Sequence, residues 1–317
     1  MTEQEESQLA SAVLMIRPAR FASNPLTAAS NRFQGRTPDE PAQQQRDAAR
    51  EFDGLREALE AAGIDVVAVR DTPEPEKPDA IFPNNWVSFH ADGRVVLYPM
   101  LAPNHRTERR TDIIEMLGRE YGFLVREIID LSVHEADGHF LEGTGSLVLD
   151  RVHRVAYACL SPRTTLEALG DFAERLDYDV VTFDAVDRDG TPVYHTNVLM
   201  NVGEKTAVIC AEAIPDNDQR AAVLARLCST GHEVIEITME QVNAFAGNML
   251  ELRSAAGNRV IAMSGQARNS MDNDQLAALE RVATIISAPI EHIESSASGS
   301  VRCMLAEIHL PREATAS

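Results

Sequence analysis

The stretch GSLVLDRVHRVAYACL, residues 145–160, holds two apolar runs separated by a short polar turn. Short apolar runs bounded by turn residues are typical of buried strands, so the stretch predicts a strand pair. The same form recurs in NVLMNV with TAVICAE, at 197–202 and 206–212, and in NMLELR with RVIAMS, at 248–253 and 259–264. The recurrence predicts a repeated unit that is built on a pair of strands.

Each unit also contains a helix and a further strand. Amphipathic helices are expected near 40–62, 106–121, 162–177, 216–230 and 273–285. After them come the β-rich runs DVVAV, FLVREI, DVVTF, EVIEI and PIEHI, which start at residues 65, 123, 179, 233 and 289, so successive starts are 54 to 58 residues apart. A fixed period of this size indicates a repeat architecture. Each unit therefore reads helix, strand, polar cluster, strand, strand.

The polar clusters recur at nearly the same period. They hold Asn85, Glu142, Asn197, Asn248 and Cys303. Radial closure of such units leaves few exposed sheet edges, and the N-terminal run LMIRPA (14–19), which no helix precedes, would complete the last unit's sheet. We predict one α/β ring of five units, with the polar clusters meeting at its centre as the default binding site.

Composition narrows the functional class. The chain has 317 residues and a net charge of −20, which argues against nucleic acid and anionic membrane partners. No apolar run is long enough to span a bilayer, and the acidic N-terminus does not resemble a signal peptide. Four cysteines without a CxxC motif favour free thiols in the cytoplasm. We expect a single domain over 13–311, with flexible tails at 1–12 and 312–317.

Cys303 is the strongest candidate for chemistry. It follows the small residues Ser298, Gly299 and Ser300, which could form a tight turn with free N–H groups, and its neighbour Arg302 would help to stabilise a thiolate. The alternative is a buried structural cysteine, which is the common role of free cysteines. We assign that role to the remaining three, Cys159, Cys210 and Cys228.

A cysteine nucleophile needs a base, and the base needs an acceptor that orients it. His195 in YHTN and Glu142 in FLEGTG occupy positions in their repeats equivalent to that of Cys303. The segment HEADGH at 134–139 could suggest a metal, but its spacing matches no standard zinc pattern. Because dinucleotide and phosphate-binding motifs are also missing, we expect neither a metal nor a cofactor.

The motifs FLEGTG, YHTN and SGSVRCM, at these spacings, resemble the guanidino-group-modifying enzyme superfamily of arginine deiminases, dimethylarginine dimethylaminohydrolases and amidinotransferases. The resemblance extends from about Leu14 to Leu310. MIRPARFASN, PDAIFPNNWVSFH and the Cys303 segment are most similar to citrulline-utilisation hydrolases of the citrulline ureidase type. The resemblance implies a five-bladed α/β propeller of pseudo-repeated ββαβ units around a central site, in agreement with the repeat.

The resemblance also implies residue roles. Cys303 would be the nucleophile, His195 the proton-transfer residue and Glu142 its acidic partner. The segment PDAIFPNN would contact the reacting end of the substrate, and APNHRTE and LSPRT would supply arginines to its α-carboxylate. The substrate-binding residues expected from these segments, together with the asparagine two residues after His195, are Asp79, Asn84, Asn85, Arg106, Arg163 and Asn197. A solvated charge remains an alternative for both arginines, and a turn or strand-end role for Asp79.

Three of these residues, Asn84, Asn85 and Asn197, are amides where relatives carry carboxylates. A guanidinium only donates hydrogen bonds, whereas a neutral ureido group also presents a carbonyl oxygen that an amide N–H can meet. We therefore expect hydrolysis of citrulline to ornithine, CO2 and ammonia through a covalent cysteine adduct. A deiminase or dihydrolase of arginine or a methylarginine stays open, since Asp79 and Glu142 remain acidic. A catalytically silent binding protein stays open as well. A papain-like protease is disfavoured because its nucleophile normally precedes its histidine. The sequence leaves open whether the chain forms a homo-oligomer.

Overall fold

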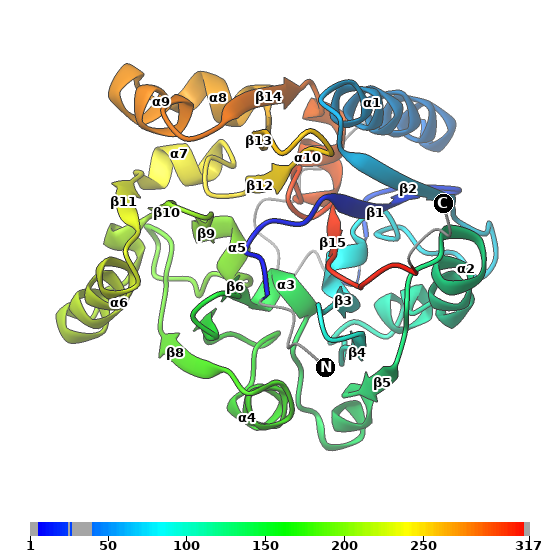
Figure 1. The fold of residues 1–317 in the computed structure, drawn as a ribbon, viewed down its shortest axis with the longest axis horizontal. Coiled ribbons are helices and arrows are strands. Elements are labelled where there is room, and N and C mark those ends of the chain that lie inside the picture. The colour runs from blue at the N-terminus through cyan, green and yellow to red at the C-terminus, as the bar shows by residue number, and fades with distance from the viewer. Residues whose placement is uncertain (1–5, 25, 27–39, 314–317) are drawn as a thin grey trace.

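The computed structural model describes residues 6–24, 26 and 40–313. Within them the strands form five separate three-stranded sheets arranged as a ring, and the long helices lie on the outside (Figure 1). In each sheet the middle strand is antiparallel to the inner strand and parallel to the outer one. The fold is thus the five-bladed α/β propeller that the repeat predicted.

The first blade is closed by the two ends of the chain. β1 (Ala12–Arg17) pairs antiparallel with β15 (Ala306–Ile308) and parallel with β2 (Asp65–Arg70). Figure 1 shows β1 and β15 side by side near the centre of the ring. The prediction that the N-terminal strand completes the sheet of the last unit is confirmed, because β1 pairs with β15. This pairing explains why no helix needs to precede β1.

The other blades follow in chain order. Their strands are β3 (Val87–Phe89), β4 (Arg94–Leu97) and β5 (Glu127–Asp130); β6 (Val148–Asp150), β7 (Val155–Cys159) and β8 (Asp179–Phe183); β9 (Met200–Val202), β10 (Thr206–Ile209) and β11 (Glu233–Glu236); β12 (Leu250–Arg253), β13 (Arg259–Ser264) and β14 (Thr284–Ala288). The outer helices are α1 (Pro41–Ala61), α2 (Thr111–Tyr121), α4 (Leu166–Leu176), α6 (Asn217–Ser229), α8 (Gly265–Ser270) and α9 (Asn273–Glu280).

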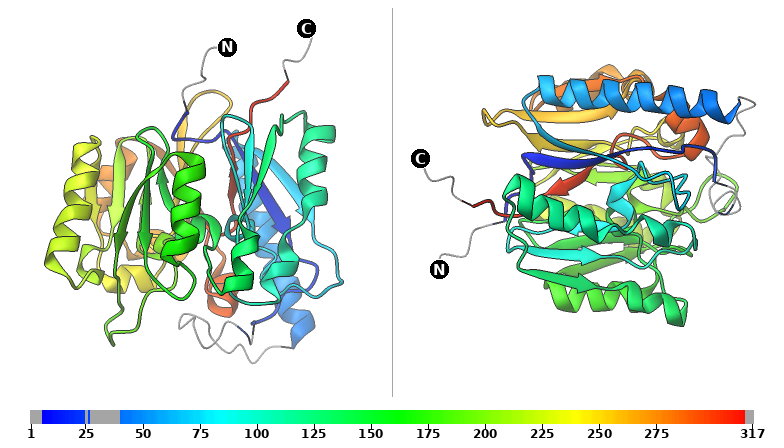
Figure 2. Two further views of the ribbon diagram at one scale, coloured as in Figure 1. Left: turned by 90° about the horizontal axis from the view of Figure 1, so that it is seen from below. Right: turned by 90° about the vertical axis from the view of Figure 1, so that its right-hand side faces the viewer.

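Local signals explain where these helices begin and end. The side chain of Asp216 accepts hydrogen bonds from the N–H groups of Asp218 and Gln219 and so caps α6. Gly122 ends α2 in the left-handed conformation, with φ of 71°. The apolar face of each outer helix packs on its sheet, and strands such as β7 are buried along their whole length. The orthogonal views in Figure 2 show the helices outside the sheets.

One predicted strand is wrong. PIEHI (289–293) does not form a strand: the strand of that unit is β14, which ends at Ala288, and Glu291 begins the helix α10 (Glu291–Ala297). A short apolar run does not distinguish a strand from a helix, and here the β-rich TIISA just before it pairs with β13. Other boundaries move as well. The predicted strand 123–128 starts at Glu127, and the predicted helices 106–121 and 162–177 start at Thr111 and Leu166. The predicted helix 273–285 ends at Glu280, before β14 begins at Thr284.

Residues before the expected domain start at residue 13 also take part in the fold. Gln8 is buried, and its amide donates hydrogen bonds to the carbonyl oxygens of Leu149 and Val202 at 2.9 Å each. At the other end, Arg312 pairs with Phe123. The predicted tail residues 1–5 and 314–317 lie outside the described residues. Among the helices of the described chain, none is long and apolar enough to cross a membrane.

Candidate active site

The polar clusters of the blades meet at a pocket near the centre of the ring. Each cluster occupies the turn just before the innermost strand of its blade: residues 83–85 before β3, α3 (Gly143–Ser146) before β6, and α5 (Thr196–Leu199) before β9. The pocket lining contains Asp79, Phe82, Asn85, His105, Arg163, Tyr194, His195, Ala297, Ser298, Gly299 and Cys303. The fold therefore brings together residues that lie more than 200 positions apart in the chain.

Cys303 lies in this pocket with 4% of its surface exposed. Its Sγ accepts hydrogen bonds from two amides, Nδ2 of Asn248 at 3.3 Å and Nδ2 of Asn197 at 3.5 Å. The Asn248 amide is itself fixed, because its oxygen accepts the backbone N–H of Arg302 at 3.1 Å. Burial raises the pKa of the Cys303 thiol above its ordinary value, and the amide N–H groups offset only part of that shift.

His195 and Glu142 form a buried pair, and His195 lines the same pocket as Cys303. Nε2 of His195 lies 2.8 Å from Oε2 of Glu142. Burial alone would raise the pKa of the Glu142 carboxyl, but the Arg163 guanidinium and His195 outweigh burial and hold it well below its usual range. Burial lowers the pKa of His195 below its ordinary value despite the carboxylate. At neutral pH the resting pair is therefore a carboxylate and a neutral imidazole that is ready to accept a proton.

The glycines of FLEGTG allow these groups to approach closely. A Cβ on Gly145 would lie 2.6 Å from Oδ1 of Asn85 and 2.7 Å from Nδ1 of His195. Gly143 adopts a φ of +48°, and a Cβ there would overlap the backbone oxygen of Asn84. The motif therefore has a steric function that the sequence analysis did not assign: it leaves room for the imidazole and Asn85 against one short turn.

The two asparagines of FPNNW lie differently. Asn85 lines the pocket, and its Oδ1 has no hydrogen-bond partner among the described residues. Asn84 does not line the pocket; it is fully buried, and both of its side-chain polar atoms lack a partner within the described chain. Of this pair, only Asn85 is therefore positioned to meet a ligand in the pocket.

Asp79 lines the pocket together with a residue that the sequence analysis missed. Oδ2 of Asp79 lies 2.6 Å from Nε2 of His105 and accepts a hydrogen bond from Nδ2 of Asn24 at 2.7 Å. Burial would lower the pKa of His105, but the nearby carboxyl groups of Glu108 and Asp79 raise it to about 9. Burial raises the pKa of Glu108 to about 8. The raised pKa of His105 favours a cationic imidazole beside Asp79 at neutral pH.

The two predicted arginines also differ. Arg163 is buried at the pocket, with Nη1 3.2 Å from Oε2 of Glu142 and its guanidinium over the Tyr194 ring at 5.0 Å. Arg106 does not line the pocket: its side chain is one-third exposed, donates to the Met100 oxygen at 3.0 Å and pairs with Glu135 at 3.3 Å. The structure therefore does not bring Arg106 to the pocket, and its neighbour His105 lines the pocket instead.

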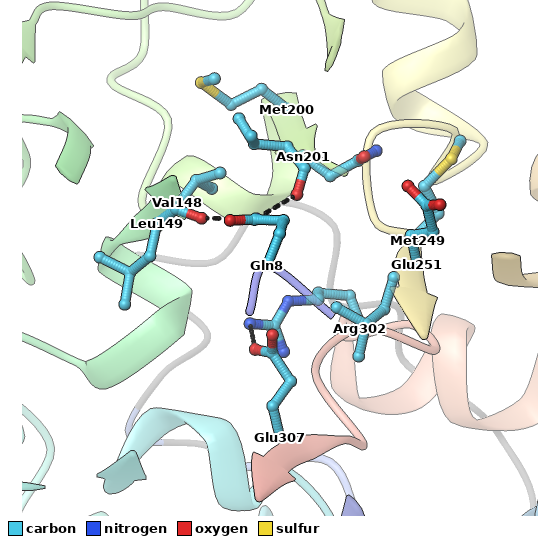
Figure 3. A pocket seen from close by; sticks show the side chains of 11 residues that line it. Gln8, Val148, Leu149, Met200, Asn201, Met249, Glu251, Arg302 and Glu307 are labelled. Atoms are coloured by element: carbon cyan, nitrogen blue, oxygen red, sulfur yellow. Dashed lines mark hydrogen bonds and ion pairs between the residues drawn. The ribbon is translucent and has the colours of Figure 1, made fainter. Parts of the chain in front are cut away.

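Arg302 acts on the thiol in the expected direction: burial raises the pKa of Cys303, and the Arg302 charge lowers it without outweighing burial. The guanidinium of Arg302 pairs with Glu307 at 2.6 Å and donates to the Leu305 oxygen at 2.9 Å. It lines a second pocket with Gln8, which Figure 3 shows hydrogen-bonded to the backbone of β6 and β9. The guanidinium is therefore shared between Glu307 and the neighbourhood of the thiol, and burial of Cys303 remains the largest influence on its pKa.

The other candidate groups have structural partners. In HEADGH, Nε2 of His134 lies 2.9 Å from Oδ2 of Asp171, and the residues that the structure describes contain no cluster of three or more groups placed to hold a metal ion. All four cysteines are free. Cys159 and Cys210 are buried, and burial raises the pKa of each to about 12. Cys228 is exposed, so the buried role expected for it is wrong.

Comparison with known proteins identifies one matching family. A model of the family described as N,N dimethylarginine dimethylhydrolase, eukaryotic, matches residues 17–310. No curated protein matches the sequence significantly.

Solved structures share the fold at low sequence identity. ArgZ, an arginine dihydrolase from the ornithine-ammonia cycle in Cyanobacteria, is 19% identical with a TM-score of 0.71, and the match covers 95% of this chain and 41% of ArgZ. Unliganded AgrE is 18% identical with a TM-score of 0.73, covering 96% of this chain and 40% of AgrE. A dimethylarginine dimethylaminohydrolase adduct with S-methyl-L-thiocitrulline is 16% identical with a TM-score of 0.65, covering 95% and 100%. This chain thus spans about two fifths of ArgZ and AgrE.

Proposed function

The chain belongs to the N,N dimethylarginine dimethylhydrolase family, and from that premise we propose that it is a cysteine-dependent hydrolase of a C–N bond in the guanidino or ureido group of an amino acid. One observation carries the proposal: Cys303 and His195 line the same pocket, and Glu142 holds the imidazole from behind. A nucleophile, a base and an orienting acid in this order are the groups that covalent hydrolysis requires.

The chemistry proceeds in two steps. The Cys303 thiol transfers its proton to neutral His195, and Sγ forms a bond to the central carbon of the substrate group. Imidazolium then donates that proton to the departing nitrogen as the C–N bond breaks, which leaves an S-linked intermediate. Water attacks the same carbon, His195 takes a proton from the water, and the C–S bond breaks as the imidazolium returns that proton to the departing Sγ. The Glu142 carboxylate stabilises imidazolium in both steps.

For the substrate we favour citrulline, with its δ-nitrogen as the leaving group. The S-carbamoyl intermediate would then hydrolyse to carbamate, which decays to CO2 and ammonia, and ornithine would remain. Support comes from the charges at the pocket: Asp79 is paired with His105, and Glu142 with Arg163. The unpartnered Oδ1 of Asn85 supplies an acceptor for ureido N–H without adding charge.

Arginine is the second candidate, because the matching family and the name of ArgZ both refer to guanidino substrates. A further solved structure of the N-terminal domain of ArgZ, in which an asparagine is replaced by serine, is covalently bound to a reaction intermediate. A covalent intermediate on this fold agrees with the S-linked intermediate proposed here. In that case two hydrolyses would release two molecules of ammonia from arginine.

A product assay tests the proposal. Purified protein is incubated with citrulline, arginine and dimethylarginine, and ornithine, ammonia and methylamines are quantified. We expect ornithine and ammonia from citrulline, with loss of turnover in Cys303→Ala. Turnover of arginine without citrulline would replace the first candidate by the second. No product from any of the three, together with binding of one, would favour a catalytically silent binding protein. Full activity in Cys303→Ala would refute the mechanism.

The binding partners and the cellular location of the enzyme are part of the same proposal. We expect a small amino acid as its partner, with neither nucleic acid nor a membrane involved. Four free cysteines suit a reducing cytoplasm.

A further inference from the structure

The substrate pocket contains two carboxyl–cation pairs rather than free carboxylates. Asp79 and His105 both line the pocket and are joined at 2.6 Å, and Glu142 lies 3.2 Å from Arg163. We propose that His105 determines the charge preference of this site: by pairing with Asp79 it favours a neutral ureido group over a cationic guanidinium. This inference rests on the proposed hydrolase function and assigns its selectivity to one residue.

The pairing matters because the pocket is buried. His105 and Asp79 are 2% and 4% exposed, so water screens their charges poorly. A guanidinium that entered would lose its hydration and would need an uncompensated anion nearby. Asp79 would be that anion if it stood alone, but the imidazolium of His105 offsets it. A neutral ureido group needs no such anion and is not penalised.

Glu108 belongs to the same turn as His105 and favours the charged form of its imidazole. Both of its carboxyl oxygens are buried without a hydrogen-bond partner among the described residues. Although burial lowers the pKa of His105, the carboxyl groups of Glu108 and Asp79 raise it to about 9, so the imidazolium form is favoured at neutral pH. His105 thus places a cation 2.6 Å from the Asp79 carboxyl at the pocket.

Replacement of His105 by glutamine separates charge from hydrogen bonding. The glutamine amide can still donate to Asp79 but carries no charge. The ratio of kcat/KM for arginine to that for citrulline should rise at least about tenfold over wild type, because Asp79 becomes an unpaired anion. His134→Gln is the matched control: it changes another histidine–aspartate pair, 2.9 Å to Asp171, outside the pocket. Its ratio should equal that of wild type.

Asp79→Asn tests the same idea in the opposite direction. It leaves the His105 charge without a partner, so the arginine-to-citrulline ratio should fall. If circular dichroism shows that a variant is folded but its turnover is too slow to measure, the ratio of the dissociation constants for arginine and citrulline is measured by calorimetry in a Cys303→Ala background. If either variant does not fold, the other decides.

The outcomes separate the two proposals. A wild-type enzyme that hydrolyses neither substrate refutes the proposed function. An active wild type with a ratio unchanged within about twofold in His105→Gln refutes only the role of His105, as does an equal change in the His134→Gln control.

Discussion

Replacing Gly145 by alanine should impair catalysis while the protein remains folded. Gly145 lies in the turn that supports His195 and Asn85, and an added Cβ would meet Nδ1 and Cε1 of His195 at 2.7 and 2.8 Å. Ordinary contacts begin near 3.4 Å, so the ring must move by about 0.7 Å. Glu142 holds Nε2 at 2.8 Å, and the Tyr194 ring packs 4.8 Å from the imidazole centre, so the ring does not move without losing a contact.

This displacement has a calculable order of magnitude. Misplacing a catalytic group by about 1 Å costs about a hundredfold in rate, so we expect kcat to fall by about that factor in Gly145→Ala. Overpacking of a buried site typically costs about 1–3 kcal/mol of unfolding free energy. Both quantities are measured on the same preparations, the first with the substrate identified in the product assay and the second by urea unfolding.

Gly170→Ala provides the matched control. Gly170 lies in α4 on the exposed side, and an added Cβ there would meet no atom within 4 Å. Its kcat should be unchanged, and its unfolding free energy should rise by up to about 1 kcal/mol because alanine favours the helix. If Gly145→Ala keeps kcat within about twofold of wild type, the close approach between the turn and His195 does not position the base, and this reasoning fails.

Three further predictions concern the pocket. Asn85→Asp adds a carboxylate to the pocket lining and should shift specificity toward arginine by about tenfold, measured as the ratio of kcat/KM values; an unchanged ratio would remove Asn85 from substrate selection. Because burial raises the pKa of Cys303, its alkylation by iodoacetamide, followed by peptide mass spectrometry, should accelerate as pH rises, with a midpoint above the ordinary cysteine pKa. Asn248→Ala removes an N–H donor to Sγ and should move the midpoint higher still. A midpoint below the ordinary value would contradict both statements.

Several elements of the fold could be read from local pattern, and others could not. The strand pair at 148–150 and 155–159 was predictable because its apolar runs are short, turn-bounded and fully buried. The helix at Glu291–Ala297 was not, because PIEHI alternates apolar and polar residues over a stretch too short to distinguish a strand from a helix. Pairing of TIISA with β13 decided between the two, and that pairing is a long-range contact.

The choice of His105 over Arg106 shows the same limit within the site. Both residues belong to one 3-10 turn (His105–Glu108), in which successive side chains point about 120° apart. The sequence places a cationic pair near the pocket but does not determine the phase of the turn. Packing set that phase: His105 is buried against Asp79, and Arg106 turns outward to Glu135.

The sequence alone determined the five-fold period, the number of blades and the positions of Cys303, His195 and Glu142, because a repeat records spacing directly and each polar cluster sits at the same point of its unit. Only the tertiary structure decided which polar side chains face the pocket and which charges cancel there. Those properties depend on distances of a few ångströms between residues from different blades. Asn84 and Asn85 illustrate this difference. They are the same residue type at adjacent positions, yet in the folded chain Asn85 lines the pocket and Asn84 is buried outside its lining.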